Sequence, residues 1–321
     1  MVTARIALAP VSVAGGPLRW PIWSEARWAL SVWVLSIVLL GSLAASGAGA
    51  RTAKPQPPPV TLTSPVTKGS QYLALGDSVT FGYQEPTVVP APNYRNASSF
   101  LGYPEQLAAE LHLRVINPAC PGETSASLIN ASAQSNGCEN GPIAYRKLYP
   151  LHLRYKGSQL AYAVSFLRSH PQVKLVSLMI GANDLFLCQA KTKDGCTSSA
   201  EQQAVFTKVA GNVRRILSAV RNQAHYRGQL AIVNYYSLNY AVALLSNASR
   251  GLNRAVDEGA KPFGVVIADG YGEFQTASRR SAQNPCTAGL LTQLSIGGCG
   301  VHPTYAGQAL LAQALLKAIR L

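Results

Sequence analysis

Acidic residues are scarce in this chain of 321 residues: 14 Asp and Glu stand against 28 Lys and Arg, which gives a net charge of +14. A strongly basic surface can attract anionic partners such as a membrane, an acidic polysaccharide or a nucleic acid. The sequence carries no nucleic-acid-binding motif and no interleaving of aromatic with basic residues, so nucleic acid is not an expected partner. Two interpretations of the charge remain: the basic surface contacts an anionic surface, or it is simply solvated by water.

The sequence also has no metal-binding pattern and no tryptophan in its C-terminal nine-tenths. There is no CxxC pair and no cluster of His and Cys at zinc spacing, so we expect no metal and no other cofactor. No tryptophan lies beyond Trp33, which excludes a Trp-lined sugar platform in the rest of the chain, although tyrosines could replace one. These absences leave chemistry that ordinary side chains carry out alone.

Charge is missing altogether from residues 28–50, a run long enough to cross a membrane. Basic residues precede the run, and Ala48-Gly49-Ala50 at its end is an A-x-A pattern typical of signal-peptide cleavage. We therefore expect residues 1–50 to be a signal peptide or, if uncleaved, a signal anchor, and the rest of the chain to be secreted or extracytoplasmic. Residues 51–69 are rich in proline and predict an extended linker, which leaves 70–321 as one domain.

Six cysteines agree with export, because an even count in an exported chain points to disulfides. The count alone allows many pairings. We expect neighbours along the chain to pair, because each such pair brackets one apparent loop. The predicted disulfides are Cys120–Cys138, Cys188–Cys196 and Cys286–Cys299.

Short apolar runs alternate with helical patterns along the exported part. The apolar runs show little alternation, which is typical of strands buried on both faces. The predicted strands are Tyr72–Leu75, Arg114–Asn117, Leu175–Ile180, Leu230–Asn234 and Val265–Ala268. The predicted helices are Pro104–His112, Ser158–His170, Ala200–Ala224, Tyr240–Glu258 and Tyr305–Ile319. This order predicts an α/β fold with a five-stranded parallel sheet that helices cover on both sides. Long loops are expected at about 83–102, 131–157 and 186–199, where they would shape a site.

Four segments with glycine or polar residues follow strand ends or precede the last helix. Gly76-Asp77-Ser78 follows the first predicted strand, and the segment around Gly122 follows the second. Asn183 comes just after the third strand, and His302 directly before the last helix. Because the carboxyl ends of parallel strands share one edge of a sheet, we expect these residues to meet there.

Together these residues supply the parts of an acyl-transfer site. A serine hydroxyl needs a base to take its proton, and histidine is the usual base near neutral pH. Ser78 is the candidate nucleophile and His302 the candidate base. The charge that develops on a carbonyl oxygen needs fixed donors. The backbone N–H groups of Ser78 and Gly122 and the side-chain amide of Asn183 can provide them.

The four segments resemble the SGNH (GDSL-type) hydrolase family, whose name stands for Ser, Gly, Asn and His. The resemblance covers about residues 70–320 and rests on the order and spacing of all four segments. It implies a flavodoxin-like three-layer α/β/α sandwich and ester hydrolysis through an acyl-enzyme. It also implies the roles given above for Ser78, Gly122, Asn183 and His302. The layout with three disulfides looks like the secreted bacterial lipase and esterase branch.

Two positions depart from the family pattern. Val79 stands where the family usually has Leu, which is a small apolar change. The family also places an Asp three residues before the histidine, where this chain has Cys299, and no acid follows Glu273. Three accounts compete: a backbone carbonyl in the 295–300 loop orients the histidine, Asp269 replaces the missing acid, or most activity is lost.

The sequence therefore predicts a metal-independent serine ester hydrolase that acts as a monomer on small-molecule or lipid acyl esters. One alternative keeps the chemistry and takes acetylated polysaccharide as the substrate. The other alternative is a noncatalytic surface protein that keeps the fold to bind a glycan or a lipid, an interpretation that the missing acid suggests.

Overall fold

A parallel five-stranded sheet with the order β2-β1-β3-β4-β5 forms the centre of the computed structural model, which describes residues 64–321. The strands are β1 (Gln71–Gly76), β2 (Arg114–Ile116), β3 (Val173–Met179), β4 (Gln229–Val233) and β5 (Val265–Ala268). The chain leaves β1 for the edge strand β2 and then returns to β3 on the other side of β1. This reversal makes the carboxyl ends of β1 and β3 the topological switch point, where open α/β sheets bind ligands.

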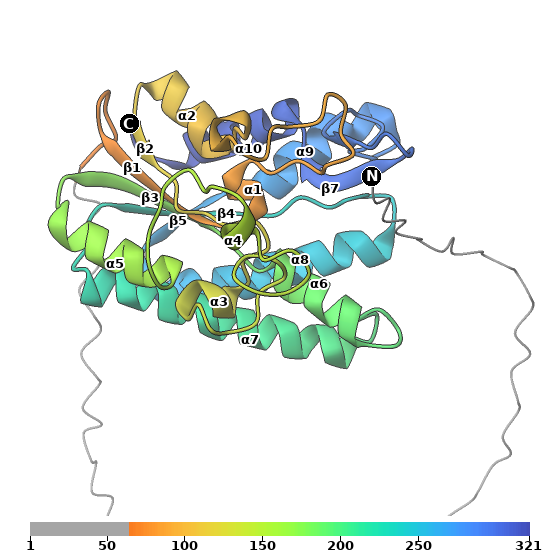
Figure 1. The fold of residues 1–321 in the computed structure, drawn as a ribbon, viewed down its shortest axis with the longest axis horizontal. Coiled ribbons are helices and arrows are strands. Elements are labelled where there is room, and N and C mark those ends of the chain that lie inside the picture. Colours follow the sequence, from red (N-terminus) through yellow and green to blue (C-terminus); the bar gives the residue numbers. More distant parts are fainter. Residues whose placement is uncertain (1–63) are drawn as a thin grey trace, which may run out of the picture. The chain divides into compact units, whose positions relative to one another are not determined.

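Helices cover both faces of the sheet, as Figure 1 shows. One layer contains α2 (Tyr103–Leu111), α9 (Gly270–Ser278) and α10 (Tyr305–Ala318). The other contains α3 (Ser125–Ile129), α5 (Gln159–Ser169), α6 (Ala182–Lys191), α7 (Ser199–Ser218) and α8 (Ala243–Ala260). The apolar stripe of α7 is buried against its neighbours through Val209, Val213 and Ile216, each 0% exposed. The predicted three-layer α/β/α architecture is confirmed.

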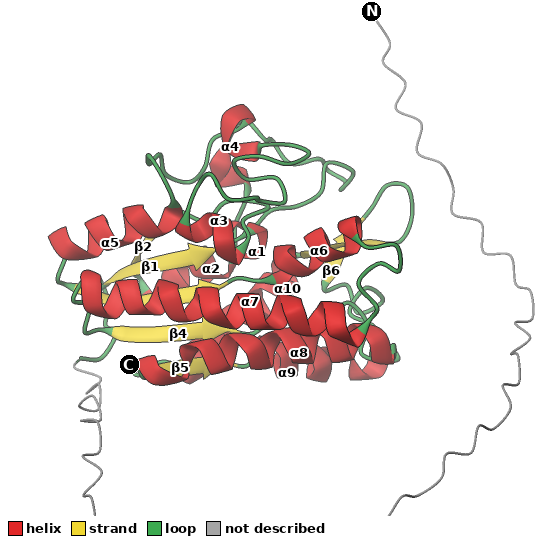
Figure 2. Cartoon of the chain, turned by 90° about the horizontal axis from the view of Figure 1, so that it is seen from below, coloured by secondary structure: helices red, strands yellow, loops and turns green. Residues whose placement is uncertain are grey.

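Each predicted strand and long helix has a counterpart in the fold, with shifted ends. Several elements were not predicted. Helix α6 runs to Lys191, so it occupies the start of the loop predicted at 186–199. Helix α9 follows β5, where no helix was expected. An antiparallel hairpin of β6 (Leu291–Gln293) and β7 (Cys299–Pro303) precedes α10, where no strand was expected. Figure 2 separates the hairpin strand β6 from the main sheet.

The N-terminal part of the described chain is packed. The Val66 side chain is 2% exposed, and its backbone N–H donates a hydrogen bond of 2.9 Å to the Arg320 carbonyl oxygen. Residues 64–69 of the predicted linker therefore lie against the domain. None of the helices within 64–321 is long and apolar enough to span a membrane. The predicted leader at 1–50 lies outside the described residues.

A second apolar cluster holds the long loops together. It combines Phe81, the last residue of the short helix α1 (Ser78–Phe81), and Tyr83 with Phe100 and Tyr145 from the later loops. Tyr145 begins the short helix α4 (Tyr145–Leu148), and its ring centroid lies 5.5 Å from that of Phe81. The Tyr83 ring also meets the His302 ring edge-on, with centroids 4.8 Å apart. The cluster therefore fixes the loops beside one of the candidate site residues.

Candidate active site

Ser78 stands at a sharp turn between β1 and α1. Strand β1 ends at Gly76 and α1 begins at Ser78, which puts the hydroxyl at the C-terminal edge of the sheet. Close packing requires the glycine, because a Cβ atom at Gly76 would lie 2.2 Å from Thr80 Oγ1. Asp77 caps α1 by accepting a hydrogen bond of 3.0 Å from the Val79 backbone N–H. Local packing and capping thus fix the direction of the serine.

His302 reaches Ser78 from the β6–β7 hairpin. Its Nε2 lies 2.9 Å from Ser78 Oγ, a hydrogen-bond distance. The disulfide Cys286–Cys299 ties the first residue of β7 to the segment before β6. The structure pairs all six cysteines as the sequence predicted, with Cys120–Cys138 and Cys188–Cys196 as the other disulfides. The histidine is therefore held on a short, cross-linked hairpin.

Glu85 supplies the acid that was missing near the histidine in the sequence. It lies in the loop after α1, and its Oε1 is 2.7 Å from His302 Nδ1. The same carboxylate accepts hydrogen bonds from Thr292 Oγ1 at 2.5 Å and from the Val301 backbone N–H at 2.8 Å. Serine, histidine and glutamate thus form a continuous hydrogen-bonded relay.

This geometry corrects the expectations about the orienting group. His302 Nδ1 bonds to a carboxylate rather than to a backbone carbonyl of the 295–300 loop. Asp269 caps helix α9 instead, where its Oδ1 accepts a hydrogen bond of 2.9 Å from the Gly272 backbone N–H. Both suggestions failed because they considered only residues near the histidine in sequence or at a strand end. The acid comes from a loop 217 positions upstream.

Electrostatics keep the Glu85 carboxylate charged. Burial by itself would raise its pKa, but the hydrogen bond and the charge of His302, together with the hydrogen bond from Thr292, lower the pKa to about 2. The group is therefore ionised throughout the neutral range. An ionised carboxylate at this position fixes the tautomer of the histidine and stabilises its protonated form.

Asn183 lies in the first turn of α6, and its amide is oriented from both ends. Asn136 Nδ2 donates a hydrogen bond of 2.9 Å to Asn183 Oδ1. Asn183 Nδ2 lies 3.3 Å from Asp77 Oδ2. An amide nitrogen has two hydrogens, so one can bond to Asp77 while the other stays available to a substrate oxygen. The ionised Asp77 carboxylate only accepts hydrogen bonds, so it settles which end of the amide faces it, and Asn136 holds the other end.

Gly122 lines the same hollow as Ser78 and Asn183. Its φ of +81° lies in the left-handed region, and a Cβ atom there would be 2.6 Å from the Asn136 carbonyl oxygen. The Asn136 backbone N–H donates a hydrogen bond of 2.7 Å to the Gly122 carbonyl oxygen. A side chain at this position would therefore be strained and would displace a segment that also orients Asn183.

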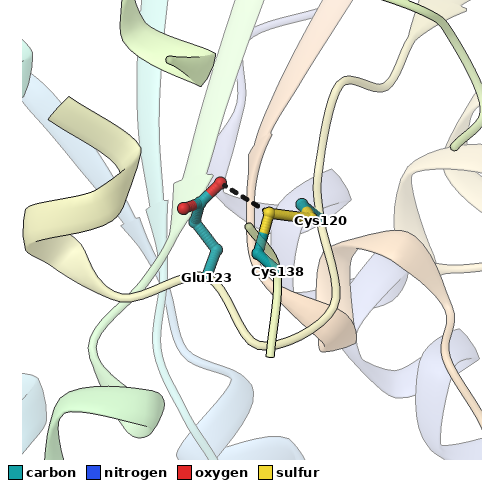
Figure 3. Close-up of side chains that lie close together, drawn as sticks. All are labelled: Cys120, Glu123 and Cys138. Atoms are coloured by element: carbon teal, nitrogen blue, oxygen red, sulfur yellow. Dashed lines mark hydrogen bonds between the residues drawn. A yellow bond between two sulfur atoms is a disulfide. The ribbon is translucent and has the colours of Figure 1, made fainter. Parts of the chain in front are cut away.

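The Cys120–Cys138 disulfide closes the loop that contains this glycine turn. Figure 3 shows Glu123 beside the disulfide. Glu123 points toward it, with Oε2 3.6 Å from Cys138 Sγ. Burial raises the pKa of Glu123 to about 7, although hydrogen bonds from Ser127 and Gln159 act against the rise. These three groups are close enough to hold a metal ion, but a disulfide offers no thiolate to a metal. The arrangement serves to stiffen the turn.

Asp77 is a further buried carboxyl next to the site. Tyr235 follows β4, and its hydroxyl donates a hydrogen bond to Asp77 Oδ2. Burial raises the pKa of Asp77 to about 6, while the hydrogen bonds from Tyr235 and the Val79 N–H oppose that rise. Besides Glu85, sequence reasoning missed Tyr235 and Asn136, since neither belongs to a recognisable motif.

Two hollows meet at Ser78 and His302. One has a volume of about 90 Å³, and its apolar wall includes Leu185, Phe186, Leu238, Leu245 and Leu252. The other has a volume of about 460 Å³, and Glu85, Gly122, Asn136, Tyr145 and Gly300 contribute to its more polar wall. The nucleophile therefore stands where a narrow apolar space joins a wider one whose mixed wall carries more polar groups. Such a site can hold a group with an apolar end and a polar end.

Comparisons with known proteins show the family of the chain and similar folds. A model of the GDSL-like lipase/acylhydrolase family matches residues 74–310. Phospholipase A1 from Streptomyces albidoflavus NA297 is a similar solved structure, with 19% identity, a TM-score of 0.50, and coverage of 78% of this chain and 99% of that one.

The acetylxylan esterase Axe2 from Geobacillus stearothermophilus is another similar structure, with 17% identity, a TM-score of 0.48, and coverage of 79% of this chain and 95% of that one. No curated protein matches the chain. At 19% identity the phospholipase structure shows the fold alone.

Proposed function

Because the chain belongs to the GDSL-like lipase/acylhydrolase family, we propose that it hydrolyses carboxylic esters through an acyl-enzyme on Ser78. The observation that carries the proposal is the relay from Ser78 Oγ to His302 Nε2 at 2.9 Å and from His302 Nδ1 to Glu85 Oε1 at 2.7 Å. It joins a nucleophile, a base and an orienting acid, which is the arrangement that activates a serine hydroxyl.

The first half of the reaction forms the acyl-enzyme. Ser78 Oγ bonds to the ester carbonyl carbon while its proton moves to His302 Nε2, and the carbonyl π pair moves onto the oxygen. The N–H groups of Ser78 and Gly122 and the amide of Asn183 stabilise that oxyanion. When the carbonyl re-forms, the bond to the alcohol oxygen breaks, and the alcohol leaves with the proton from His302.

The second half releases the acid. A water molecule gives a proton to His302 Nε2 as its oxygen bonds to the acyl carbon. Collapse of this intermediate breaks the bond to Ser78 Oγ, which takes the proton back. Glu85 stays ionised throughout and stabilises the histidine each time it is protonated.

The two hollows support a division of the substrate. We assign the acyl chain to the narrow apolar hollow and the alcohol to the wider polar one. A volume of about 90 Å³ favours a slender acyl chain over a bulky one. The apolar wall favours acyl esters with a hydrocarbon chain over acetylated polysaccharide. The alternative of a noncatalytic binding protein rested on the missing acid, and it loses this support because Glu85 takes the place of that acid.

Labelling with a fluorophosphonate probe tests the proposal directly. Wild-type protein should be labelled and should hydrolyse acyl esters, whereas Ser78→Ala protein should do neither. Ser249→Ala is the matched control, because Ser249 is a second serine on the apolar hollow and lies outside the relay. Labelling that survives Ser78→Ala, or is lost in Ser249→Ala, contradicts the assignment.

We also propose that the domain works outside the cytosol. Three disulfides support this, because such bonds persist in oxidising compartments. Protease treatment of intact cells that express the full chain should degrade an exported domain and spare a cytosolic marker protein.

A further inference from the structure

Exposed aliphatic side chains gather on the loops beside the candidate site. The largest exposed fractions among them are 79% for Ile296, 77% for Val89 and 62% for Leu148, and Ile143 is 47% exposed. A single exposed aliphatic residue is ordinary on a protein surface. A group of them on neighbouring loops calls for an explanation.

The loops that carry these residues are joined to one another. Val88 and Leu294 form an isolated antiparallel bridge, and the Ser295 N–H donates a hydrogen bond of 2.7 Å to the Thr87 carbonyl oxygen. Val89 and Ile296 therefore follow directly after paired positions. The rings of Tyr94 and Tyr149, with centroids 5.2 Å apart, connect the first of these loops to the segment around α4.

The segment before α4 also borders the site. Ile143 in this segment lines the wider hollow, as does Leu294 in the turn of the β6–β7 hairpin. Figure 2 shows α4 within a group of loops that projects from the body of sheet and helices. Ile143 thus stands at the entrance through which an ester would reach Ser78, and Val89, Leu148 and Ile296 lie on the segments joined to it.

Basic residues accompany the aliphatic ones. Arg95, Lys147 and Arg154 are exposed and line one hollow of about 560 Å³ together with Leu148. Lys156 is exposed on the same loop. No acidic residue occurs within 86–101 or 140–157, so neighbouring carboxylates in these segments do not offset the positive charge.

Arg146 differs from these residues because it is a structural cation. It pairs with Glu139, donates to the Gly157 carbonyl oxygen at 2.9 Å, and lies over the Tyr155 ring at 3.9 Å from the centroid. These contacts fix the backbone of the loop. The exposed basic residues beside Arg146 therefore point to solvent from a loop of fixed conformation.

We propose that the loops at 86–96, 143–156 and 294–298 form a docking surface for an anionic lipid bilayer. The inference rests on the proposed function, because docking would bring lipid esters to the entrance of the site. Aliphatic side chains can enter the region between head groups and acyl chains, while lysine and arginine attract anionic head groups. An acidic polysaccharide would satisfy the charge but would leave the aliphatic residues exposed to water.

Hydrogen–deuterium exchange of full-length Ser78→Ala protein tests the docking without lipid turnover. Vesicles of phosphatidylcholine mixed with phosphatidylglycerol should protect all three loops from exchange, and added salt should reduce the protection. Pure phosphatidylcholine vesicles should give little protection. Exchange is measured separately for each loop, so binding of vesicles to residues before 64 would not by itself protect these loops. It is also independent of catalysis, so a failure of the proposed hydrolysis leaves it interpretable.

Paired variants identify the surface. Each basic residue near an anionic bilayer contributes roughly a fivefold factor in partitioning, so Lys147→Gln with Arg154→Gln should weaken binding roughly 25-fold. Val89→Ser with Ile296→Ser should weaken it severalfold. The control, Lys68→Gln with Lys261→Gln, changes two exposed lysines that precede β1 and β5, at the opposite edge of the sheet.

Three outcomes would overturn the proposal. The loops could exchange equally with and without anionic vesicles. The control pair could weaken binding as much as Lys147→Gln with Arg154→Gln. A soluble polyuronate could protect the loops when vesicles do not, which would assign the surface to an acidic polysaccharide instead.

Discussion

Glu85 Oε1 lies 2.7 Å from His302 Nδ1, although the two residues are 217 positions apart in the chain. The glutamate belongs to the loop that leaves the serine, and the histidine belongs to the C-terminal hairpin. The acid therefore comes from the same stretch of chain as the nucleophile, although the two contact different nitrogens of the imidazole ring. Thr292 and the Val301 N–H hold the carboxylate from the hairpin side, so the contact also fastens the two segments together.

Replacing Glu85 by glutamine should lower kcat by roughly 10²- to 10⁴-fold, because a neutral amide neither stabilises a protonated histidine nor fixes its tautomer. Steady-state kinetics on a soluble short-chain ester measure the effect, and circular dichroism checks the fold. Asp269→Asn is the matched control and should keep kcat, since asparagine can also cap α9. A loss of kcat in Asp269→Asn but not in Glu85→Gln would show that Asp269 is the acid that orients His302.

Removing the Asn183 amide should lower kcat by roughly 10²- to 10³-fold, as expected for one oxyanion donor. Asn136→Ala should lower kcat by roughly 10- to 100-fold with KM nearly unchanged, because the Asn183 amide loses the partner that fixes its orientation. Asn130→Ala is the control, since Asn130 is exposed and its side-chain oxygen accepts a local hydrogen bond of 3.0 Å from the Ser132 N–H. A change in KM without a change in kcat would argue against a positioning role for Asn136.

Filling the apolar hollow should change which acyl chains are accepted. Leu245→Trp places a larger side chain in the wall of that hollow, so kcat/KM should fall more for longer acyl chains than for acetyl esters. Leu244→Trp changes the preceding residue, which is 48% exposed and lies outside the wall. A series of esters that differ only in acyl length measures the selectivity. Equal profiles for the two variants would place the acyl chain elsewhere.

Two buried carboxyls should make the fold less stable as the pH rises. Burial raises the pKa of Glu105 to about 7 and that of Glu123 to about 7, against 4.5 for an ordinary glutamate. The native state then binds more protons than the unfolded state between these values, so the free energy of unfolding falls across that interval. The effect should be of order 1–3 kcal/mol per carboxyl.

Urea unfolding at several pH values measures this dependence. The double variant Glu105→Gln with Glu123→Gln should show a flatter decline between pH 4.5 and 7 than the wild type. Glu110→Gln serves as the control, because Glu110 is an exposed residue of α2. Parallel curves for the wild type and the double variant would contradict the assignment.

The parallel sheet could be predicted because strands buried on both faces read as uninterrupted apolar runs. The convergence of Ser78, Asn183 and His302 followed from the rule that strand ends share an edge. Glu85 could not be predicted in this way, because no period or motif marks a residue in a long irregular loop. Its position depends on the packing of Tyr83 and Phe100 and on the pairing of the loop with the hairpin, which are contacts between distant segments. The hairpin was missed for a similar reason, since β6 is 3 residues long.

The placement of the histidine has a consequence for protein synthesis. A ribosome completes Ser78 and Glu85 early, whereas His302 follows the serine by 224 positions. A growing chain can assemble β1 to β5 while its nucleophile still has no base. On the proposed mechanism such a chain cannot hydrolyse esters, and the reaction becomes available only after the hairpin that precedes the last helix has been made.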